Sequence, residues 1–518
     1  MTEAKSQDFP EHWQEKTLSE ILKVVRGVSF PSEDKKQSPE EDHIACLRTA
    51  NVQEKVDWDD LWYIPEKHIS REEQYVREND ILISTANSYE LVGKVSLVRD
   101  LPERATLGAF ISLIRVPEGL DSKFFFYQLR STEVRNEMRQ RASTTTNISN
   151  ISTSDLNEVP LGVPPLPEQR RIVAKIEELF TNLDAGMDDL QAAGQQLERY
   201  RLSVLQAAVE GRLTADWRRT RNPEPADQLL ERILEKREKK WYKSRYKDPV
   251  EPEFGNSFPE SPDGWTVTSF DSVLSHVTSG PRGWSDYYHE GDGVFILAQN
   301  VNPWKLDLSD TKNVNPPSDA SGRDRAMVQK SDLLVTIVGA NTGDVCRVDR
   351  ELDEHWVCQS VALMRPALET TSKYLEIYLN SQLGQQQYER FAYGQGRPHL
   401  NFGQLKATPL LLPPLAEQKQ IVDEVERLLS VADEAAATAE REQTRAERLR
   451  QSILKQAFSG QLVPHEEDAA PSAIEASSSN GQAASASGDT SVSTDEDDVI
   501  AEELYNGDDP GTQIEMDL

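Results

Sequence analysis

The chain carries the sequence PPLPEQ at residues 164–169 and repeats it as PPLAEQ at residues 413–418. Behind the motif the two copies align without a gap for roughly fifty residues, so that Ile172 corresponds to Ile421 and Gly211 to Gly460. A duplication this long and uninterrupted indicates that the length of the repeated segment is under constraint. The sequence therefore predicts two related halves and a function that needs two of something.

Each copy of the motif is followed by the heptad pattern of a supercoiled helix, in which the slots advance by alternating steps of four and three. The predicted interface residues are Ile172, Ile176, Leu179, Leu183, Leu190 and Leu197 in the first helix and Ile421, Val425, Leu428, Leu449 and Ile453 in the second; Gly186, Ala193 and Tyr200 fill further slots of the first. The proline pair sets each start, and Gly211 and Gly460 favour left-handed caps near each end. About 44 residues at 1.5 Å each predict a rod of roughly 65 Å.

A stretch of about 150 residues with mixed strand and helix signals precedes each rod. These stretches share landmarks but differ freely between them: DILIS at 80–84 resembles DLLVT at 332–336, and residues 123–129 resemble residues 373–379. Short β-rich runs bounded by Gly, Asn and Asp predict a compact strand-rich domain with a few helices. A shared fold with a diverged surface is typical of two binding modules that have acquired different ligands.

Composition limits the possible functions. The net charge is −31, and residues 465–518 supply fifteen carboxylates with no Lys or Arg, so that segment is predicted to be disordered. The remaining −16 argues against a uniformly basic nucleic-acid coat but leaves room for local basic clefts. Three cysteines without metal-type spacing, a polar N-terminus and short apolar runs predict a cytoplasmic protein with no membrane span.

Motifs for catalysis are incomplete. Asn315-Pro316-Pro317-Ser318 resembles the loop that holds the target amine in adenine N6-methyltransferases, but its fourth residue is not aromatic and no cofactor-binding glycine loop precedes it. Residues 339–344 are glycine-rich but lack the Lys-Ser/Thr of a phosphate-binding loop. The eight histidines occur singly, without zinc spacing. We therefore expect no catalytic residues and no metal site.

Polar and cationic loops at corresponding places in both halves are suited to recognition, because Arg and Lys pair with guanine edges or phosphates and Asn and Gln with adenine edges. The candidate DNA-binding residues are Thr85, Asn87, Tyr89, Arg139, Arg141, Thr145 and Asn147 in the first half and Arg282, Asn341, Thr342, Gln395, Arg397 and His399 in the second. Taken singly, each loop fits a solvated turn as well as a base reader. Their recurrence in both halves is the argument for function.

The duplicated PPLxEQ motif with its heptad helix, together with the helix endings AVEGRL at 208–213 and AFSGQL at 457–462, resembles the specificity subunit of type I restriction–modification systems. The resemblance covers nearly all of residues 10–463; the acidic tail departs from the family's shorter forms. It implies an α+β fold, in which two strand-rich target recognition domains are separated by two long antiparallel coiled-coil helices, with a disordered acidic tail. The expected parts are recognition domains at 1–163 and 263–411, coiled-coil helices at 164–214 and 412–463, a charged linker at 215–262 and the tail at 464–518.

By the same resemblance, each recognition domain reads one half of a bipartite site on double-stranded DNA, and the rods set the gap between the halves. Two methyltransferase subunits would dock on the rods, and two motor-nuclease subunits would join for cleavage. Those partners would carry S-adenosylmethionine, ATP and magnesium, so no cofactor is expected on this chain.

Two rival hypotheses and one question about the tail remain open at this stage. A coiled-coil scaffold that never touches DNA would fit the acidity but leaves the two diverged domains unexplained. A fused methyltransferase would require the cofactor loop that the sequence lacks. The tail is either a solubilising segment or a competitor that keeps DNA from cationic faces.

Overall fold

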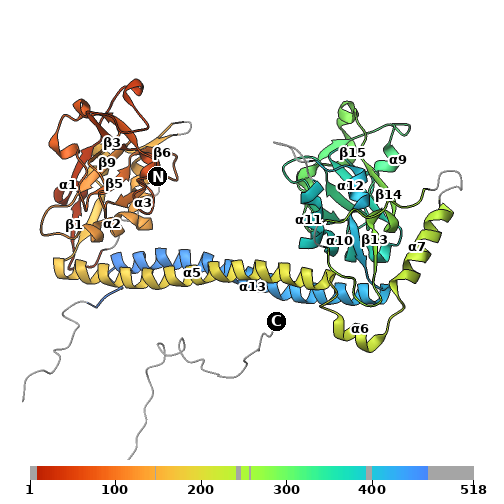
Figure 1. Ribbon diagram of the computed structural model, residues 1–518. Helices are drawn as coiled ribbons and strands as arrows, with labels where there is room; N and C mark the ends of the chain where they lie inside the picture. The colour runs from red at the N-terminus through yellow and green to blue at the C-terminus, as the bar shows by residue number, and fades with distance from the viewer. Residues whose placement is uncertain (1–8, 146–147, 241–246, 256–257, 392–398, 465–518) are drawn as a thin grey trace, which may run out of the picture. The chain divides into compact units, whose positions relative to one another are not determined.

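The computed structural model describes residues 9–145, 148–240, 247–255, 258–391 and 399–464. Along the chain, a strand-rich domain is followed by a long helix, and this order occurs twice (Figure 1). The expected α+β fold with two strand-rich domains and two long helices is confirmed. The acidic tail after Pro464 lies outside the described residues.

Domain 1 (up to residue 163) is built from short strands and short α-helices. Its strands are β1 (Gln14–Thr17), β2 (Lys23–Arg26), β3 (His43–Leu47), β4 (Trp62–Pro65), β5 (Ile81–Ser84), β6 (Ala86–Asn87), β7 (Val95–Leu97), β8 (Ala105–Leu107), β9 (Ile111–Arg115), β10 (Ser143–Thr144), β11 (Ser149–Asn150) and β12 (Pro160–Val163). Its α-helices are α1 (Leu18–Ile21), α2 (Ser122–Arg130), α3 (Thr132–Arg141) and α4 (Thr153–Asn157), with short 3-10 helices at Ser32–Asp34, Thr49–Asn51, Glu66–His68 and Glu72–Gln74.

Domain 2 repeats this plan after the linker. Its strands are β13 (Thr266–Ser269), β14 (Leu274–Ser279), β15 (Tyr288–Ile296), β16 (Val301–Asn302), β17 (Lys305–Leu306), β18 (Lys312–Val314), β19 (Leu333–Thr336), β20 (Val345–Arg347), β21 (His355–Val357), β22 (Val361–Pro366) and β23 (Pro409–Leu412). Its α-helices are α8 (Phe270–Val273), α9 (Arg323–Ala326), α10 (Ser372–Asn380), α11 (Gln382–Phe391) and α12 (Phe402–Ala407), with 3-10 helices at Trp284–Tyr287, Ala298–Asn300 and Glu369–Thr371.

The sheets of the two domains have the same topology. An antiparallel sheet of order β2-β9-β5-β7 corresponds to β14-β22-β19-β20, and a mixed sheet β4-β3-β8 corresponds to β18-β15-β21. In the mixed sheets β3 runs parallel to β8, as β15 does to β21. The first and last strands of each domain pair with each other, β1 with β12 and β13 with β23. The loose sequence similarity of the two halves therefore reflects one fold used twice.

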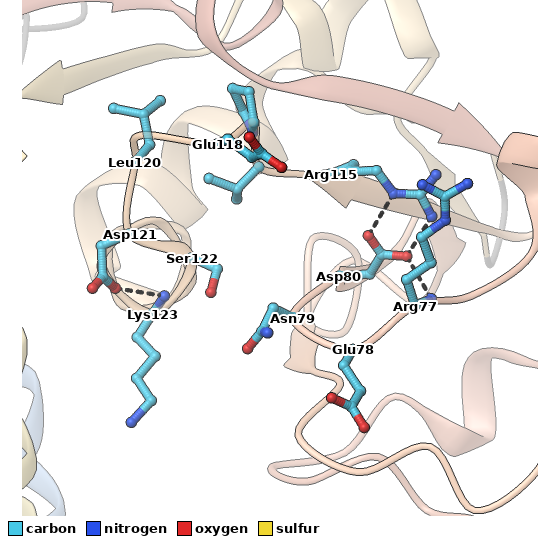
Figure 2. Close-up of a pocket in the computed structure, with 12 residues that line it drawn as sticks. Arg77, Glu78, Asn79, Asp80, Arg115, Glu118, Leu120, Asp121, Ser122 and Lys123 are labelled. Atoms are coloured by element: carbon cyan, nitrogen blue, oxygen red, sulfur yellow. Dashed lines mark hydrogen bonds and ion pairs between the residues drawn. The ribbon is translucent and has the colours of Figure 1, made fainter.

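Buried polar contacts are duplicated as well. Asn51 donates through Nδ2 to two carbonyl oxygens of the following loop at 2.9 Å each, and Asn300 makes the matching pair of bonds at 2.8 and 2.7 Å. Figure 2 shows the second example in domain 1: Arg115 donates from Nε and Nη2 to the carboxylate of Asp80, whose side chain is buried. The Arg365–Asp332 pair repeats it in domain 2.

The long helices α5 (Leu166–Val209) and α13 (Leu415–Phe458) have 44 residues each, as the heptad pattern predicted. Both begin directly after their proline pair, and Gly211 and Gly460 just beyond their ends have φ of 71° and 73°. This left-handed conformation is cheap only for glycine. The proline and glycine signals thus set both ends of both helices.

Two symmetric ion pairs show that α5 and α13 pack antiparallel. Arg450 of α13 pairs with Asp184 of α5, and Arg201 of α5 pairs with Asp433 of α13. Moving from residue 184 to 201 along α5 therefore moves from 450 back to 433 along α13. The duplication matches Asp184 with Asp433 and Arg201 with Arg450, so the two ion pairs are equivalent, as a two-fold axis between the helices requires.

In the contact between the helices, one of the two predicted interface positions in each heptad is replaced by the next residue along the chain. In the middle of α5 the half-buried positions are Leu183, Met187, Leu190, Gly194, Leu197 and Arg201, while Gly186, Ala193 and Tyr200 are exposed. In α13 the same shift leaves Leu449 42 % exposed and buries most of the Arg450 side chain. The aliphatic parts of Arg201 and Arg450 cover apolar surface, while their guanidinium groups form the ion pairs between the helices. Each arginine therefore occupies the interface position in place of the apolar residue that precedes it.

The predicted interface residues near the ends of the two helices lie in the cores of the domains. Ile172 and Ile176 of α5, together with Leu454 and Phe458 of α13, are buried against domain 1. The other ends of the two helices, including Ile421 and Val425, are buried against domain 2. Leu179, Leu428 and Ile453 are partly buried. Each domain therefore rests on the start of one long helix and the end of the other.

The PPLxEQ motif attaches each domain to the start of its helix. Trp13 Nε1 donates to Glu168 at 3.0 Å, and Trp265 Nε1 donates to Glu417 at 3.0 Å. The glutamine that follows closes the turn by donating to the first proline carbonyl, from Gln169 to Pro164 and from Gln418 to Pro413, at 2.9 Å in both copies. The motif therefore ties each domain to the start of its long helix through buried hydrogen bonds.

The charged linker forms α6 (Ala215–Arg221) and α7 (Ala226–Lys240) and packs on domain 2. Leu229 and Ile233 of α7 are buried in the domain 2 core. Arg237 reaches the buried carboxylate of Asp271 at 3.2 Å. The linker thus belongs to domain 2.

Candidate nucleic-acid interface

Two candidate loops of domain 1 are joined in one small sheet. Strand β6, which contains Asn87, pairs with β11, and β11 pairs with β10, the strand that leads to Thr145. Thr85 is tied in from both sides: its amide donates to the Phe110 carbonyl at 3.0 Å, and its carbonyl accepts from the Ile151 amide at 2.9 Å. Segments some sixty residues apart in sequence therefore form one surface.

Tyr89 and Arg139 lie beside this sheet. The guanidinium carbon of Arg139 lies 5.9 Å from the centre of the Tyr89 ring, and Tyr89 is 53 % exposed. Arg135 and Arg139 both donate to the carbonyl of Glu90, which holds the loop against α3. An exposed aromatic ring beside an arginine can stack on a base while the cation contacts the backbone.

Arg141 and Thr145 already have partners within domain 1. Arg141 is occupied by two carboxylates, Glu137 at 2.8 Å and Glu158 at 3.2 Å, and its charge is largely neutralised. The Thr145 hydroxyl donates to the Ile148 carbonyl at 3.2 Å and closes the loop tip. Asn147 lies outside the described residues.

In domain 2, Asn341 and Thr342 occupy the tight turn after β19. The Thr342 hydroxyl donates to the Gly339 carbonyl at 2.8 Å, and the Asn341 carbonyl accepts from the Asp344 amide at 3.1 Å. His399 is brought to the same place because it forms a β-bridge with Val338. Three predicted residues therefore gather at one edge, whereas Gln395 and Arg397 lie outside the described residues.

Arg282 is exposed in the turn that follows β14, two residues before the buried Trp284. It lies on a different strand connection from the turn at 339–344. Its placement fits a contact with the phosphate backbone as well as one with a base.

An aromatic and cationic cavity in domain 1 was missed by the sequence reasoning. It has a volume of about 460 Å³ and is lined by Phe30, Lys35, Arg48, Trp62 and Phe110 among others. Lys35 and Arg48 lie over the Trp62 ring, at 4.4 and 4.9 Å from its centre, and Phe110 is 66 % exposed. Since the Phe110 carbonyl accepts the Thr85 amide, the cavity adjoins the candidate loop. Its residues are spread over eighty positions, so only the fold could have revealed it.

The polar cavity of Figure 2, about 610 Å³, is built around the Arg115–Asp80 pair and the N-terminus of α2. Asp80 also accepts the backbone amide of Arg77 at 2.8 Å. Every strong contact here stabilises the domain, and domain 2 repeats the pair. The cavity is therefore part of the fold, with no reacting group aimed into it among the residues drawn.

No catalytic arrangement emerges in the described part of the chain. The segment at 315–318 is a surface turn whose Asn315 amide donates to the Tyr287 carbonyl at 3.0 Å. Within the described ranges, no group of three or more potential metal ligands occurs. The three cysteines are buried, and burial raises the pKa of the Cys46 thiol to about 12, which keeps it protonated. None of the helices in those ranges is long and apolar enough to span a bilayer.

Comparison with known families explains the duplicated architecture. The model of the type I restriction modification DNA specificity domain matches residues 10–189 and 318–441. The chain belongs to this family. Among curated specificity-domain relatives, the EcoKI specificity subunit of Escherichia coli K12 is 26 % identical over 88 % of this chain and 90 % of its own length. The StySPI specificity subunit of Salmonella potsdam is also 26 % identical, with the same coverage.

Solved structures show the same fold as this specificity-domain protein. A chain from a study of complex assembly and conformational transition of a type I R-M system superposes with a TM-score of 0.61 at 19 % identity, covering 88 % of this chain and 99 % of the other. The HsdS subunit from Thermoanaerobacter tengcongensis gives a TM-score of 0.50 at 19 % identity, covering 89 % of this chain and 100 % of its own.

Proposed function

We propose that this chain is the DNA-recognition subunit of a type I restriction–modification complex, in which each domain reads one half of a bipartite DNA site. The observation that carries the proposal is the pair of equivalent ion pairs between α5 and α13, Arg450–Asp184 and Arg201–Asp433. They relate the two halves by a two-fold axis, and each half carries one copy of the same domain.

The two-fold axis gives the proposal its physical logic. Two similar domains related in this way present the same surface in opposite senses, which suits the two antiparallel strands of a duplex. The domains differ in their loops, so the two half-sites would differ in sequence. The helices of 44 residues, capped at both ends, would then set the gap between half-sites.

The partners belong to the same proposal. Tyr200 and Leu449 are equivalent under the duplication and are 40 % and 42 % exposed, because the contact between α5 and α13 passes beside them. In this proposal, each of the two exposed residues marks the place on the helix pair where one partner docks. Two equivalent surfaces fit two methyltransferase subunits, joined by two motor-nuclease subunits for cleavage. We assign S-adenosylmethionine, ATP and magnesium to those partners, catalysis included, and we place the complex in the cytoplasm with the DNA it acts on.

Titration of the assembled complex on duplex DNA at several salt concentrations tests the proposal. A recognition subunit gives affinity for one duplex at least about 10³-fold above that for unrelated duplexes, with a slope against salt that reports phosphate contacts. A coiled-coil scaffold gives no preference among duplexes. Equal affinities in a properly assembled complex would therefore refute the proposal.

A further inference from the structure

Domain 1 carries a cluster of basic side chains that extends from the candidate residue Arg139 well beyond the candidate base-reading loops. Its members are Lys94 in the turn before β7, Arg99 after β7, Arg130 at the end of α2, and Arg135 and Arg139 on α3. We name these five residues the cationic face. In a chain with a net charge of −31, five cations gathered on neighbouring elements of one domain need a cause.

The cationic face borders two cavities that share Glu54 and Arg130 and therefore adjoin. One, of about 250 Å³, is lined by Lys94, Arg130 and Arg135; the other, of about 570 Å³, is lined by Arg99 and Arg130 and by Arg450 of α13. Glu54 pairs with Arg130 and with Arg450, both at 3.3 Å. Carboxylates of α5 also face the larger cavity, and Asp184 is paired with Arg450. Over all the charged residues that line them, each cavity keeps a positive excess of two charges.

The cations lie close enough to disturb one another. Burial and the neighbouring Arg135 and Arg130 lower the pKa of Lys94, and only Glu54 opposes this. Burial and the charges of Arg139 and Arg130 likewise lower the pKa of Arg135. The Nε atoms of Arg135 and Arg139 are buried and have no hydrogen-bond partner among the described residues. An arriving anion would relieve the repulsion and could accept hydrogen bonds from these cations.

Domain 2 shows that the fold does not require these charges. From β7 through α3 the two domains align without a gap, at a constant offset of 250 positions: Val95 matches Val345, and Ser131 matches Ser381. The residues in the five corresponding places are Asp344, Asp349, Asn380, Gln385 and Glu389. Five positively charged residues in domain 1 thus correspond to two neutral and three negatively charged residues in domain 2.

We propose that the cationic face is a phosphate-binding surface for the DNA backbone, present on domain 1 alone, so that the two halves of the site contribute unequally to affinity. This inference rests on the proposed function. Arg139 links the face to the candidate reading loop through Tyr89, 5.9 Å away, so DNA at the loop lies next to the cation at one end of the face. Phosphate contacts position a duplex and carry most of the salt-dependent affinity, whereas base contacts carry specificity.

Matched substitutions in the two domains test whether only domain 1 contributes phosphate contacts. The variant Lys94→Gln/Arg99→Gln/Arg135→Gln removes three charges, and its third substitution installs the residue found in domain 2. The matched control, Arg350→Gln/Lys373→Gln/Arg390→Gln, removes three cations from the corresponding strand end and helices of domain 2. A charge-retaining variant, Lys94→Arg/Arg99→Lys/Arg135→Lys, shows whether any loss is due to charge.

The assay is binding of the assembled complex with its methyltransferase subunits to a cognate and an unrelated duplex across salt concentrations. Each lost phosphate contact flattens the slope of log K against log salt by about 0.9, so the domain 1 variant should lose about 2 to 3. At 0.1 M salt this weakens binding to both duplexes on the order of 10²-fold, while the ratio between them stays the same. The control and the charge-retaining variant should keep the original slope.

Three results would overturn the inference. An unchanged slope in the domain 1 variant would show that the face does not touch phosphates. An equal loss in the domain 2 control would remove the asymmetry. Loss of methyltransferase binding, with normal DNA affinity in whatever complex assembles, would assign the face to an acidic protein surface. Failure of the proposed function looks different, because the unsubstituted complex would then show no preference for any duplex.

Discussion

The contact that attaches domain 2 to its helix allows a quantitative prediction, the effect of Glu417→Gln. The Glu417 side chain is fully buried and accepts three bonds: from Trp265 Nε1 at 3.0 Å, from the Thr214 hydroxyl at 2.6 Å and from Arg218 Nη1 at 2.9 Å. Its counterpart in domain 1, Glu168, accepts from Trp13 at 3.0 Å and from the half-exposed His12 at 3.2 Å. The two sites share the tryptophan and differ in the arginine.

Because only Glu417 pairs with an arginine, Glu417→Gln should cost more stability than Glu168→Gln. In Glu417→Gln, the glutamine keeps one acceptor oxygen, but its amide group points toward one of the donors that the carboxylate accepted from. Arg218, whose side chain is only 16 % exposed, loses its charge partner. Removing one partner of a buried pair costs about 3 to 5 kcal/mol; we expect about 3 because Arg218 keeps its bond to the Gly211 carbonyl. In Glu168→Gln the tryptophan bond survives, so the cost is about 1 kcal/mol.

Hydrogen exchange of the amides in β13 and in the first turn of α13 measures the local free energy of opening, which suits a chain with several domains better than one melting temperature. The matched measurement for Glu168→Gln uses β1 and the first turn of α5. The double variant Glu417→Gln/Arg218→Met should recover part of the loss, because it removes the unpaired charge. Equal losses at the two sites, or a double variant no better than the sum of its parts, would refute the reasoning.

The other predictions concern the rods, the tail and the asparagine turn. One variant carries a seven-residue insertion between Gln191 and Ala192 and a second one between the facing residues Glu442 and Gln443, which keeps the heptad and lengthens both helices by about 10 Å. The gap in the methylated motif should then grow by about 3 bp. An unchanged gap would show that the helices do not set the distance between half-sites. Tyr200→Glu with Leu449→Glu should weaken methyltransferase binding at least about tenfold without unfolding the chain, measured by calorimetry, since both residues are exposed; unchanged affinity would move the docking surface elsewhere. Truncation after Pro464 should tighten nonspecific DNA binding at low salt, because it removes fifteen carboxylates that would compete with DNA for the cationic surfaces; unchanged affinity leaves the tail a solubilising segment. Asn315→Ala should leave methylation by the complex within about twofold of the original, as expected of a surface turn, and a large loss would reopen the methyltransferase hypothesis.

Local signals in the sequence were enough to predict the long helices. Proline geometry fixed their starts at Leu166 and Leu415, and the glycine caps fixed their ends, because both effects act within a few residues. The slots at 200 and 449 were assigned to the helix contact because apolar counting gives no weight to an arginine stem. The fold gives that weight to Arg201 and Arg450, whose heads find carboxylates across the interface.

The candidate interface was harder to predict, since it depends on contacts between distant segments. The polar residues at 85–89 and at 139–147 were predicted as separate sites, but the pairing of β6 with β11 that joins their loops is a property of the sheet. The cavity around Trp62 and Phe110 joins residues with no shared pattern. The cationic face could not be predicted from the sequence, because Lys94 and Arg135 lie about forty positions apart there and resemble ordinary solvated charges.

The methylation pattern of DNA from cells that express this chain with its methyltransferase subunit tests the central claim most directly. Modification-sensitive sequencing should find methylated adenines in a split motif of two different short half-sites around a gap of fixed length. Two different half-sites are expected because the loops of domains 1 and 2 differ. A continuous motif, or no methylation by a complex shown to assemble, would contradict the account.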